Sequence, residues 1–317
     1  MTAPLPWSRA WRQAARDFWS DAQPGDHFRT AAGPLLADRI ADLVDEVDAR
    51  LGHPEDFVVI DMGCGDAELL ALVRERCPHL ADRARWIGVD VRPVTQAGVE
   101  SVVTEVPALL DIAPVRGVVM AHEWLDEIPC DVVERDGDGV DRLVLVDADG
   151  RELLGPSLAD DSACADMGVD ASAMKSWIER WWPLSEPGDR AEIGLARDDA
   201  WRWMCGLVTS GAALATDYGH VGTDRRDRHR GGTLAGYRAG AFVRPSPDGI
   251  VNLTAHVALD ACAHAVQGTT ITRQRDVLES PALVAQPTAA EVEAYFAGLR
   301  LRDPRAWGDV GWLRWDA

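Results

Sequence analysis

The stretch Asp61–Leu70 reads DMGCGDAELL and directly follows the apolar run 57–60. Two glycines, Gly63 and Gly65, separate this run, which is typical of a buried strand, from a stretch with helical patterning. A strand, a glycine turn and a helix start bring backbone N–H groups and a helix dipole to a polar ligand. The stretch therefore predicts a nucleotide-type cofactor site, although a turn of this kind can also serve only to reverse the chain.

A second short apolar run, 86–89, ends in Asp90. A carboxylate at the end of this strand can accept hydrogen bonds from both hydroxyls of a ribose. Glu68 stands where the dinucleotide pattern G-x-G-x-x-G has its third glycine, so the close helix approach that a pyrophosphate requires is not encoded. These residues favour S-adenosylmethionine (SAM) over NAD as the cofactor.

The predicted cofactor site follows from the chemistry of SAM. Transfer of its sulfonium methyl group is an in-line displacement, which requires positioning and the loss of one acceptor proton, so no metal is expected. Asp61 would lie near the amino end of the methionine part, the glycines would allow close backbone approach, and Asp90 would hold the ribose. His122 would border the methyl donor. The complete predicted set is Asp61, Gly63, Cys64, Gly65, Asp90, Val91 and His122.

Composition narrows the class of protein. The chain has 317 residues, with 32 Lys and Arg against 52 Asp and Glu, which gives a net charge of -20. Such a charge repels nucleic acids and anionic membranes and favours a cationic substrate. The sequence has no apolar run long enough to span a bilayer and no signal-peptide pattern, and its six cysteines lack metal-ligand spacing. We expect a cytoplasmic protein with reduced cysteines; the oligomeric state is not encoded.

The pattern of strands and helices predicts an α/β fold with a doubly wound, mostly parallel sheet. Helices are expected at 35–51, 67–76, 176–182, 189–210, 256–266 and 288–299, and strands at 57–61, 86–90, 101–106, 117–121, 212–216, 270–275 and 311–316. A hairpin is predicted at 130–146, around the turn Asp136–Gly139, and a long polar loop with four arginines at 220–232. The expected organisation is an N-terminal helical segment (1–52), the first part of a SAM-binding core (53–146), an insertion or cap (147–188) and the second part of the core with its substrate-side loop (189–317).

Five motifs occur in an order that resembles the MidA-like family of SAM-dependent methyltransferases. They are DMGCGDAEL (61–69), AHEWLDEIP (121–129), TDYGH (216–220), GTLAGYR (232–238) and NLTAHVALDA (252–261). The segment GDHFRTAAGPLLADRIADL, from Gly25, is similar to the family's N-terminal element. The resemblance implies a class I, Rossmann-like methyltransferase; the family includes the mitochondrial arginine methyltransferase that assists assembly of respiratory complex I.

Departures from the family pattern concentrate on the expected substrate side. The glycine turn, usually Gly-Pro-Gly-x-Gly, retains Gly63 and Gly65 but continues with Asp66-Ala67, and His122 replaces an Asn. The other departures are Ala32-Gly33 in place of Pro-Glu, Ala235 in place of Arg, Gly240 in place of His and Ala258 in place of Asp. These changes leave the identity of the methyl acceptor open.

Four residues are candidates for the catalytic side of the site. Glu123 and Asp126, three apart, can grip a guanidinium between two carboxylates; alternatively Asp126 caps a turn and Glu123 is a solvated surface residue. Tyr218 can line the acceptor channel or simply pack at its rim. His256 can accept a proton or serve as a structural residue.

Three functions remain open from the sequence. The first is a SAM-dependent methyltransferase that acts on a protein arginine. The second is a small-molecule N- or O-methyltransferase, which the substrate-side departures favour. The third is a non-catalytic SAM-binding assembly or interaction protein.

Overall fold

The computed structural model of the chain describes residues 3–21, 31–104, 114–280, 282 and 284–317. The chain divides into two compact units that are each assembled from separate segments. The first unit contains 3–21, Asp126–Asp199 and His220–Cys262; the second contains 31–104, 114–125, Ala200–Gly219 and Ala263–Ala317. We describe each unit by itself.

A seven-stranded sheet forms the framework of the second unit, in the order β16-β17-β10-β5-β2-β3-β4. The five strands from β10 to β4 pair in parallel, whereas β17 pairs antiparallel with both β10 and β16. The α/β class is therefore confirmed, with a mixed sheet. Its strands are β2 (Phe57–Met62), β3 (Arg85–Asp90), β4 (Glu100–Val103), β5 (Val115–His122), β10 (Val208–Asp217), β16 (Thr270–Arg273) and β17 (Gly311–Asp316).

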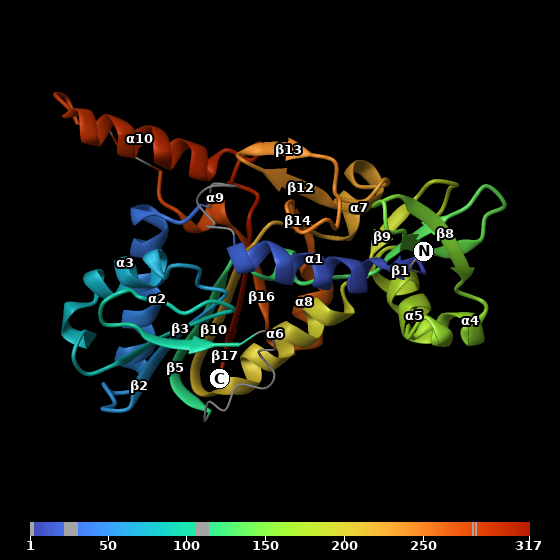
Figure 1. Cartoon of the computed structure of the whole chain (residues 1–317). Coiled ribbons are helices and arrows are strands. Elements are labelled where there is room, and N and C mark those ends of the chain that lie inside the picture. Colours follow the sequence, from blue (N-terminus) through green and yellow to red (C-terminus); the bar gives the residue numbers. More distant parts are fainter. Residues whose placement is uncertain (1–2, 22–30, 105–113, 281, 283) are drawn as a thin grey trace. The chain divides into compact units, whose positions relative to one another are not determined.

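The centre of this sheet is buried. All six residues of β2 are buried, as a continuous apolar run in a parallel sheet requires. α2 (Pro34–Arg50) packs on β5 and β10, and α3 (Glu68–Arg76) packs on α2 and β3 (Figure 1). α2 buries its apolar stripe, including Leu36, Ile40 and Val44, in the core of this unit.

The parallel strands bring four chain positions to one edge of the sheet. β2 ends at Met62, β3 at Asp90, β5 at His122 and β10 at Asp217. Ligands of open α/β sheets bind at the carboxyl ends of the strands. The predicted cofactor residues therefore gather at the edge where such a ligand is expected.

The first unit is built on an antiparallel sheet, in the order β1-β7-β6-β9, with β8 paired to β7. The predicted hairpin is confirmed: β6 (Val132–Arg135) pairs antiparallel with β7 (Asp141–Val146) around the predicted turn. The segment 147–188 contributes Leu158, Met174 and Trp177 to a core that also contains Val133 and Leu143 of this hairpin. The segment therefore does bury an apolar core, together with the hairpin that precedes it.

α1 (Trp7–Asp21) packs in the first unit against β7 and β14. Its Trp7 and Trp11 are buried with Val144 and Leu253. The remaining strands of the unit are β1 (Leu5–Pro6), β8 (Glu152–Ser157), β9 (Arg190–Glu192), β12 (Ala235–Arg238), β13 (Ala241–Val243), β14 (Asn252–Thr254) and β15 (Val257–Ala258). Of these, β12 pairs with both β13 and β14 in a separate small sheet.

Several expected boundaries differ in the structure. The segment expected to be helical from 189 starts with strand β9, and the loop expected at 220–232 contains the helix α7 (Gly222–Arg228). Strand β4 ends at Val103, and residues 105–106 of its expected range lie outside the described residues. The family's N-terminal element, at 25–30, lies wholly outside them. The other elements are α4 (Asp161–Asp166), α5 (Ala171–Trp181), α6 (Leu195–Leu207), α8 (Leu259–Ala265), α9 (Gln274–Val277), α10 (Ala289–Arg302), β11 (Gly219–His220) and the 3-10 helices η2 (Pro78–Leu80) and η4 (Leu125–Glu127).

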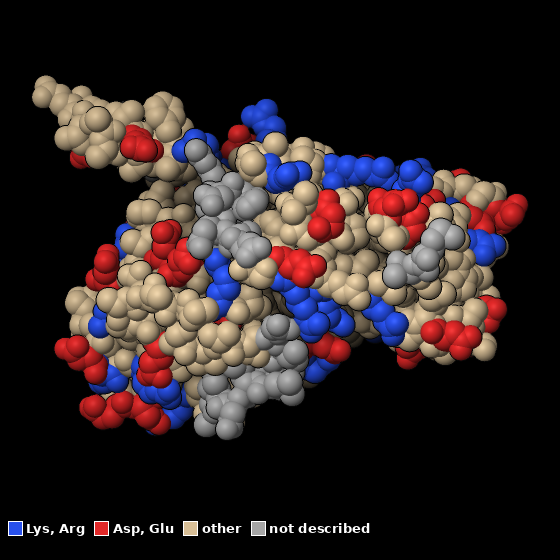
Figure 2. Space-filling view, in the orientation of Figure 1, with Lys and Arg blue, Asp and Glu red and all other residues tan. Residues whose placement is uncertain are grey.

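Charged side chains of both signs are interspersed over the face of the molecule in Figure 2. Among the described residues, no helix combines the length and the apolar character that crossing a bilayer requires.

Candidate functional site

The glycine turn lies between β2 and α3 and has the conformation that the glycines were expected to allow. Gly63 and Gly65 have φ angles of 66° and 56°, in the left-handed region that side chains with a Cβ rarely adopt. The amide of Gly63 donates to the carbonyl of Val89 over 2.8 Å, which ties the turn to the end of β3. A Cβ at Gly63 would lie 2.3 Å from Cδ1 of Trp124. Gly63 is therefore required by the packing of Trp124 as well as by the turn.

Asp61 places a buried carboxyl group below this turn. The residue is 2% exposed. Among the described residues, neither a cation nor a hydrogen-bond donor lowers the pKa of its carboxyl group. Burial, with a smaller contribution from the negative charge of Asp90, raises the pKa of Asp61 to about 8. A buried carboxylate requires a positive partner. The ammonium group of SAM has the charge and the donors that this position lacks.

Asp90 connects the glycine turn to the loop after β3. Its Oδ2 accepts a hydrogen bond from the amide of Gly65 over 2.9 Å, and its Oδ1 accepts one from the amide of Arg92 over 3.1 Å. Burial raises the pKa of Asp90, against the effect of these backbone donors. Because each carboxylate oxygen has two lone pairs, Asp90 retains acceptor capacity for ribose hydroxyls. The next residue, Val91, exposes 40% of its surface.

Cys64, between the two glycines, has a packing role. Its Sγ would lie 2.9 Å from a Cβ added at Gly88 in β3, so the thiol fills the space beside that glycine. Burial raises the pKa of the Cys64 thiol far above its usual value, so the side chain is an uncharged thiol. All six cysteines of the chain are free thiols.

The end of β5 places His122 beside Glu123. His122 Nδ1 lies 2.7 Å from Oγ1 of Thr216, and its Nε2 lies 3.4 Å from Oε1 of Glu123. Burial lowers the pKa of His122 to about 4, so the ring is neutral at physiological pH. The Glu123 side chain is only 8% exposed, which rules out the alternative that it is a solvated surface residue.

The backbone at Glu123 is held in an unusual conformation. Its φ angle is 50°, in the left-handed region, which is uncommon for a residue with a long side chain. The amide of Glu123 donates to the carbonyl of Thr216 over 2.9 Å, and its Oε1 accepts from the amide of Ala31 over 2.9 Å. Strained residues held by several neighbours are common at functional sites. Both contacts fix the direction of the carboxylate.

Asp217, at the end of β10, supports the same turn. Its Oδ2 accepts hydrogen bonds from the amides of Trp124 and Leu125, over 3.1 and 2.7 Å. Tyr218 follows it, and the Tyr218 hydroxyl accepts a hydrogen bond from Nε1 of Trp307 over 2.8 Å. The roles of Trp124, Thr216 and Asp217 were not identified from the sequence. The position of Asp217 at the end of a strand was the only signal available.

Asp126 and His256 belong to the first unit, where Arg197 organises their backbone. The Arg197 guanidinium, in a residue that is 2% exposed, donates to the carbonyls of Asp126, Ile128, Ala255 and His256 over 2.8 to 3.2 Å. Burial raises the pKa of Asp126 to about 6, against the charge of Arg197. His256 precedes β15 and α8 and is not at a helix start, so that expectation was wrong; burial lowers its pKa to about 4.

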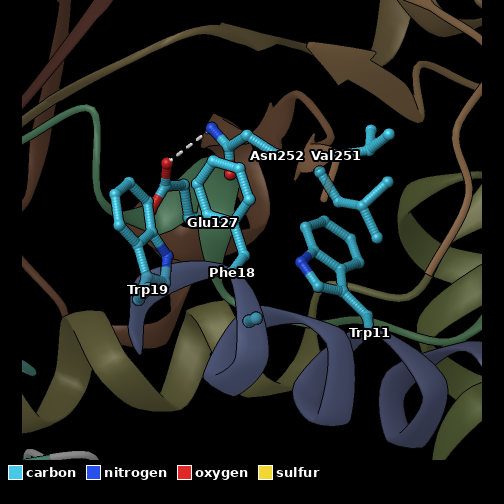
Figure 3. Close-up of a pocket in the computed structure, with 8 residues that line it drawn as sticks. Trp11, Phe18, Trp19, Glu127, Val251 and Asn252 are labelled. Atoms are coloured by element: carbon cyan, nitrogen blue, oxygen red, sulfur yellow. Dashed lines mark hydrogen bonds between the residues drawn. The ribbon is translucent and has the colours of Figure 1, made fainter. Parts of the chain in front are cut away.

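Two cavities of the first unit contain none of the predicted cofactor residues. One is lined by Trp11, Phe18, Trp19, Glu127 and Asn252, and Asn252 donates to Glu127 over 3.0 Å (Figure 3). Its volume of about 10 Å³ admits one water molecule.

The other cavity, of about 220 Å³, is lined by Glu152, Arg190, Glu192 and the exposed Arg244, and the buried charges among them have hydrogen-bond partners. Glu152 accepts hydrogen bonds from Arg190 and Trp7, and Glu192 accepts from Thr233 and Leu234. Neither cavity therefore offers an unpaired buried charge for a ligand.

Comparisons with known proteins indicate the family and the fold of the chain. Residues 35–275 match the model of a family described as "putative S-adenosyl-L-methionine-dependent methyltransferase". The fold is similar to the crystal structure of a Burkholderia thailandensis protein bound to S-adenosyl-homocysteine, with a TM-score of 0.71 and 20% identity over 99% of this chain and 88% of that chain. A native crystal structure of a protein of the same superfamily from that organism is also similar, with a TM-score of 0.71 and 21% identity. The match covers 99% of this chain and 87% of that chain. No curated protein matches the sequence.

Proposed function

Because the chain belongs to the MidA-like family of SAM-dependent methyltransferases, we propose that it methylates a guanidinium nitrogen of a protein arginine. The observation that carries the choice of acceptor is the Glu123 carboxylate. It is buried, its direction is fixed by Ala31 and by the backbone of Thr216, and it lies at the carboxyl edge of the sheet beside His122. A carboxylate in such a place suits a planar cation.

The residues of the glycine turn fit the cofactor. Asp61 offers a buried carboxyl group that no cation of the described residues neutralises, which suits the ammonium group, and Asp90 offers acceptor capacity for the ribose. Gly63, Cys64 and Gly65 would form the backbone cradle, with Val91 and His122 at its borders. The five parallel strands would then serve as a class I, Rossmann-like core, with the segment 147–188 as an inserted cap.

SAM supplies an electrophilic methyl group. The transfer forms a C–N bond from the lone pair of the acceptor nitrogen, breaks the C–S bond with its electron pair left on sulfur, and releases one N–H proton. Glu123 orients the guanidinium through its N–H groups and localises the lone pair on the attacking nitrogen. His122, neutral because burial lowers its pKa to about 4, adds no positive charge against the cationic acceptor.

Tyr218, in the second unit, is a further candidate for the acceptor side, and roles for Asp126 and His256 of the first unit stay predictions from the sequence. The raised pKa of Asp126, about 6, still leaves a carboxylate at pH 7.5, and the neutral ring of His256 can take up a proton. The hydrogen bond from Trp307 to the Tyr218 hydroxyl holds the Tyr218 ring in place, and this ring would line the acceptor channel. Each of these roles is a proposal, and substitution of the residue concerned would test it.

A small-molecule acceptor is the second candidate. It is favoured by Ala235, Gly240 and Ala258, which stand where the family resemblance places an Arg, a His and an Asp. A non-catalytic SAM-binding protein would bind the cofactor and transfer nothing. We also propose a cytoplasmic location, supported by six free thiols, and no nucleic-acid partner, supported by the net charge of -20.

The test is transfer of labelled methyl groups from SAM. Purified protein is incubated with undermodified cell protein and, separately, with a metabolite extract. Label in methylarginine supports the proposal, whereas label only in small molecules supports the second candidate. Absence of any transfer by a protein that binds SAM would leave the non-catalytic function.

Glu123→Gln separates acceptor binding from cofactor binding. The amide keeps an oxygen for the Ala31 amide but loses the charge, so SAM affinity should change less than about threefold while transfer falls about 30-fold, or about 2 kcal/mol in the barrier. Glu55→Gln, on an exposed residue, is the control. Equal loss of affinity and turnover would mean that Glu123 holds the donor, and no loss of either would refute its role.

A further inference from the structure

Three histidines of the first unit form a cluster in which only His256 is a candidate for the proposed methyl transfer. The ring centroid of His220 lies 5.2 Å from that of His229 and 6.4 Å from that of His256, and the latter two are 5.5 Å apart. His220 ends β11, His229 follows α7 and His256 precedes β15, so three separate chain segments meet here. Trp182 packs edge-on against His220 with ring centroids 4.6 Å apart.

Arg225 fixes the tautomer of His220. The Nε–H of Arg225 donates to Nδ1 of His220 over 3.0 Å. A guanidinium has no acceptor and stays protonated in proteins, so Nδ1 must be the acceptor and the proton of the neutral ring must be on Nε2. Arg225 is itself held by Asp260, to which both of its terminal nitrogens donate, and by the carbonyl of Trp181.

The Nε2–H of His220 therefore needs an acceptor, and the described part of the chain supplies none. The residue is 1% exposed, so bulk water does not reach it. Buried donors in folded proteins are almost always paired. Neither His229 nor His256 accepts this hydrogen bond in the described structure. A ligand or a bound water is the remaining source of the acceptor.

The same tautomer argues against a metal ion. A metal ligand must offer a lone pair, and the nitrogen that faces no protein partner in His220 carries a proton instead. Among the described residues no group of histidines, cysteines or carboxylates has the arrangement of a metal site. The chemistry points to an acceptor oxygen.

Two cations act on the buried His220, and their positive charge suits an anionic oxygen. Burial, followed by the positive charge of Arg225, lowers the pKa of His220 well below its usual value, and Arg197 adds to the effect. Burial and the same Arg197 lower the pKa of His256. Asp260 faces Arg225 on the other side, while Asp224 and Glu192 act on His229. His229 is only partly buried, unlike His220.

We propose that His220, His229 and His256 form a subsite that binds a carboxylate, with the Nε2–H of His220 as the central donor. The subsite lies within the first unit. His256 is also a candidate in the proposed function, whereas the central donor, His220, is not. Two sources share this chemistry, a small carboxylic acid and the C-terminus of a peptide. The probes below distinguish them.

The direct test is NMR of the full chain with ¹⁵N-labelled histidine. Acetate should shift the His220 Nε2 signal in a saturable way at constant ionic strength, with acetamide at least about tenfold weaker and methylammonium without effect. A short peptide with a free C-terminus, compared with its amidated form, identifies the second source. Equal or non-saturable shifts for acetate and acetamide would mean that a bound water alone satisfies the donor.

Variants test the assignment of the donor. His220→Gln retains an acceptor for Arg225 and an N–H donor, so acetate affinity should stay within about threefold, whereas His220→Phe should abolish binding. His79→Gln, on a half-exposed histidine of the second unit, is the control. If His220→Phe does not fold, the tautomer of the unaltered protein decides: a proton on Nδ1 would overturn the proposal.

Discussion

Asp61 carries a carboxyl group where nothing in the described structure neutralises it. Its pKa of about 8 in the cofactor-free fold, against a usual value of 3.8, means that the folded protein holds a proton that the unfolded chain has released at neutral pH. Stability therefore falls as the pH rises from about 4 to about 8, and it levels off above that. The residue that the cofactor requires is one that destabilises the cofactor-free protein.

Replacement of Asp61 by Asn should remove this loss of stability at neutral and higher pH. The cofactor-free Asp61→Asn variant should be more stable than the unaltered protein by about 1 to 3 kcal/mol above pH 8, and no more stable at pH 4. Thermal unfolding across this pH range measures the difference. Asp66→Asn, which removes a charge that is 64% exposed from the same turn, should leave the curve unchanged.

The same variant should lose cofactor affinity. Loss of a charge-assisted hydrogen bond to the ammonium group costs about 1.5 to 3 kcal/mol, or about 10- to 150-fold in the dissociation constant of SAM. Calorimetric titration of both variants measures this loss. A destabilised variant with normal SAM affinity would show that Asp61 is a structural residue.

The candidate residues could be chosen from the sequence, but the contacts that hold them could not. Asp61, Asp90 and Glu123 were identifiable because each follows an apolar strand and carries a group with suitable chemistry. The hydrogen bond between His122 and Thr216 joins two positions that are far apart in the sequence. Only the parallel pairing of β5 and β10 brings them together. No local pattern in the sequence records such a contact.

At the scale of elements, the glycine turn and the turn after β5 are packed against each other. Gly63 packs against the Trp124 ring, and the Asp217 carboxylate accepts a hydrogen bond from the backbone amide of Trp124. The turn that would contact the cofactor and the turn that carries Glu123 therefore depend on each other. A substitution in one turn should therefore disturb the packing of the other.

Gly63→Ala tests this dependence. The new Cβ would lie 2.3 Å from the Trp124 ring at a φ angle of 66°, so the variant should be destabilised by about 1 to 3 kcal/mol and should bind SAM at least about tenfold more weakly. Chemical unfolding and calorimetry measure the two effects. Gly137→Ala, in an open turn with no atom near the added Cβ, is the matched control.

A double-mutant cycle identifies the cause. If the contact with Trp124 is responsible, Gly63→Ala should cost at least about 1 kcal/mol less in a Trp124→Ala background. An undiminished cost would assign the whole effect to the backbone conformation of Gly63. In that case the proposed coupling of the two turns would be wrong.

Periodicity predicted the elements of the parallel sheet well and those of the first unit less well. β2, β3, β5 and α2 occur close to their expected ranges because their apolar patterns are long and regular. The helix α7 was missed because its sequence, GTDRRDR, has no apolar stripe. The spacing of Trp7, Trp11 and Phe18 is the signal that could have identified α1.

At the scale of the whole molecule, the chain passes repeatedly between the two units. Each unit combines segments from three parts of the sequence, which the linear pattern does not reveal. The predicted boundaries at 52, 146 and 188 follow changes in composition, and they stay a proposal. The hairpin β6–β7 shares its core with 158–184, although composition alone placed these segments in different domains.

The net charge of -20 makes the proposed reaction sensitive to salt. For a cationic protein acceptor, long-range attraction should raise association at low ionic strength, so kcat/KM should fall about tenfold or more between 50 and 500 mM salt. Affinity for S-adenosylhomocysteine, which carries no net charge, should change little and serves as the control. A kcat/KM that does not depend on salt would argue against a cationic acceptor.

We propose above all that the carboxyl edge of β2 and β3 binds SAM through Asp61 and Asp90. The most direct measurement is a crystal structure of the chain with S-adenosylhomocysteine. We expect the ammonium group within hydrogen-bond distance of the Asp61 carboxylate and the ribose hydroxyls within hydrogen-bond distance of Asp90. A ligand held elsewhere, or one that leaves Asp61 without a positive partner, would contradict it.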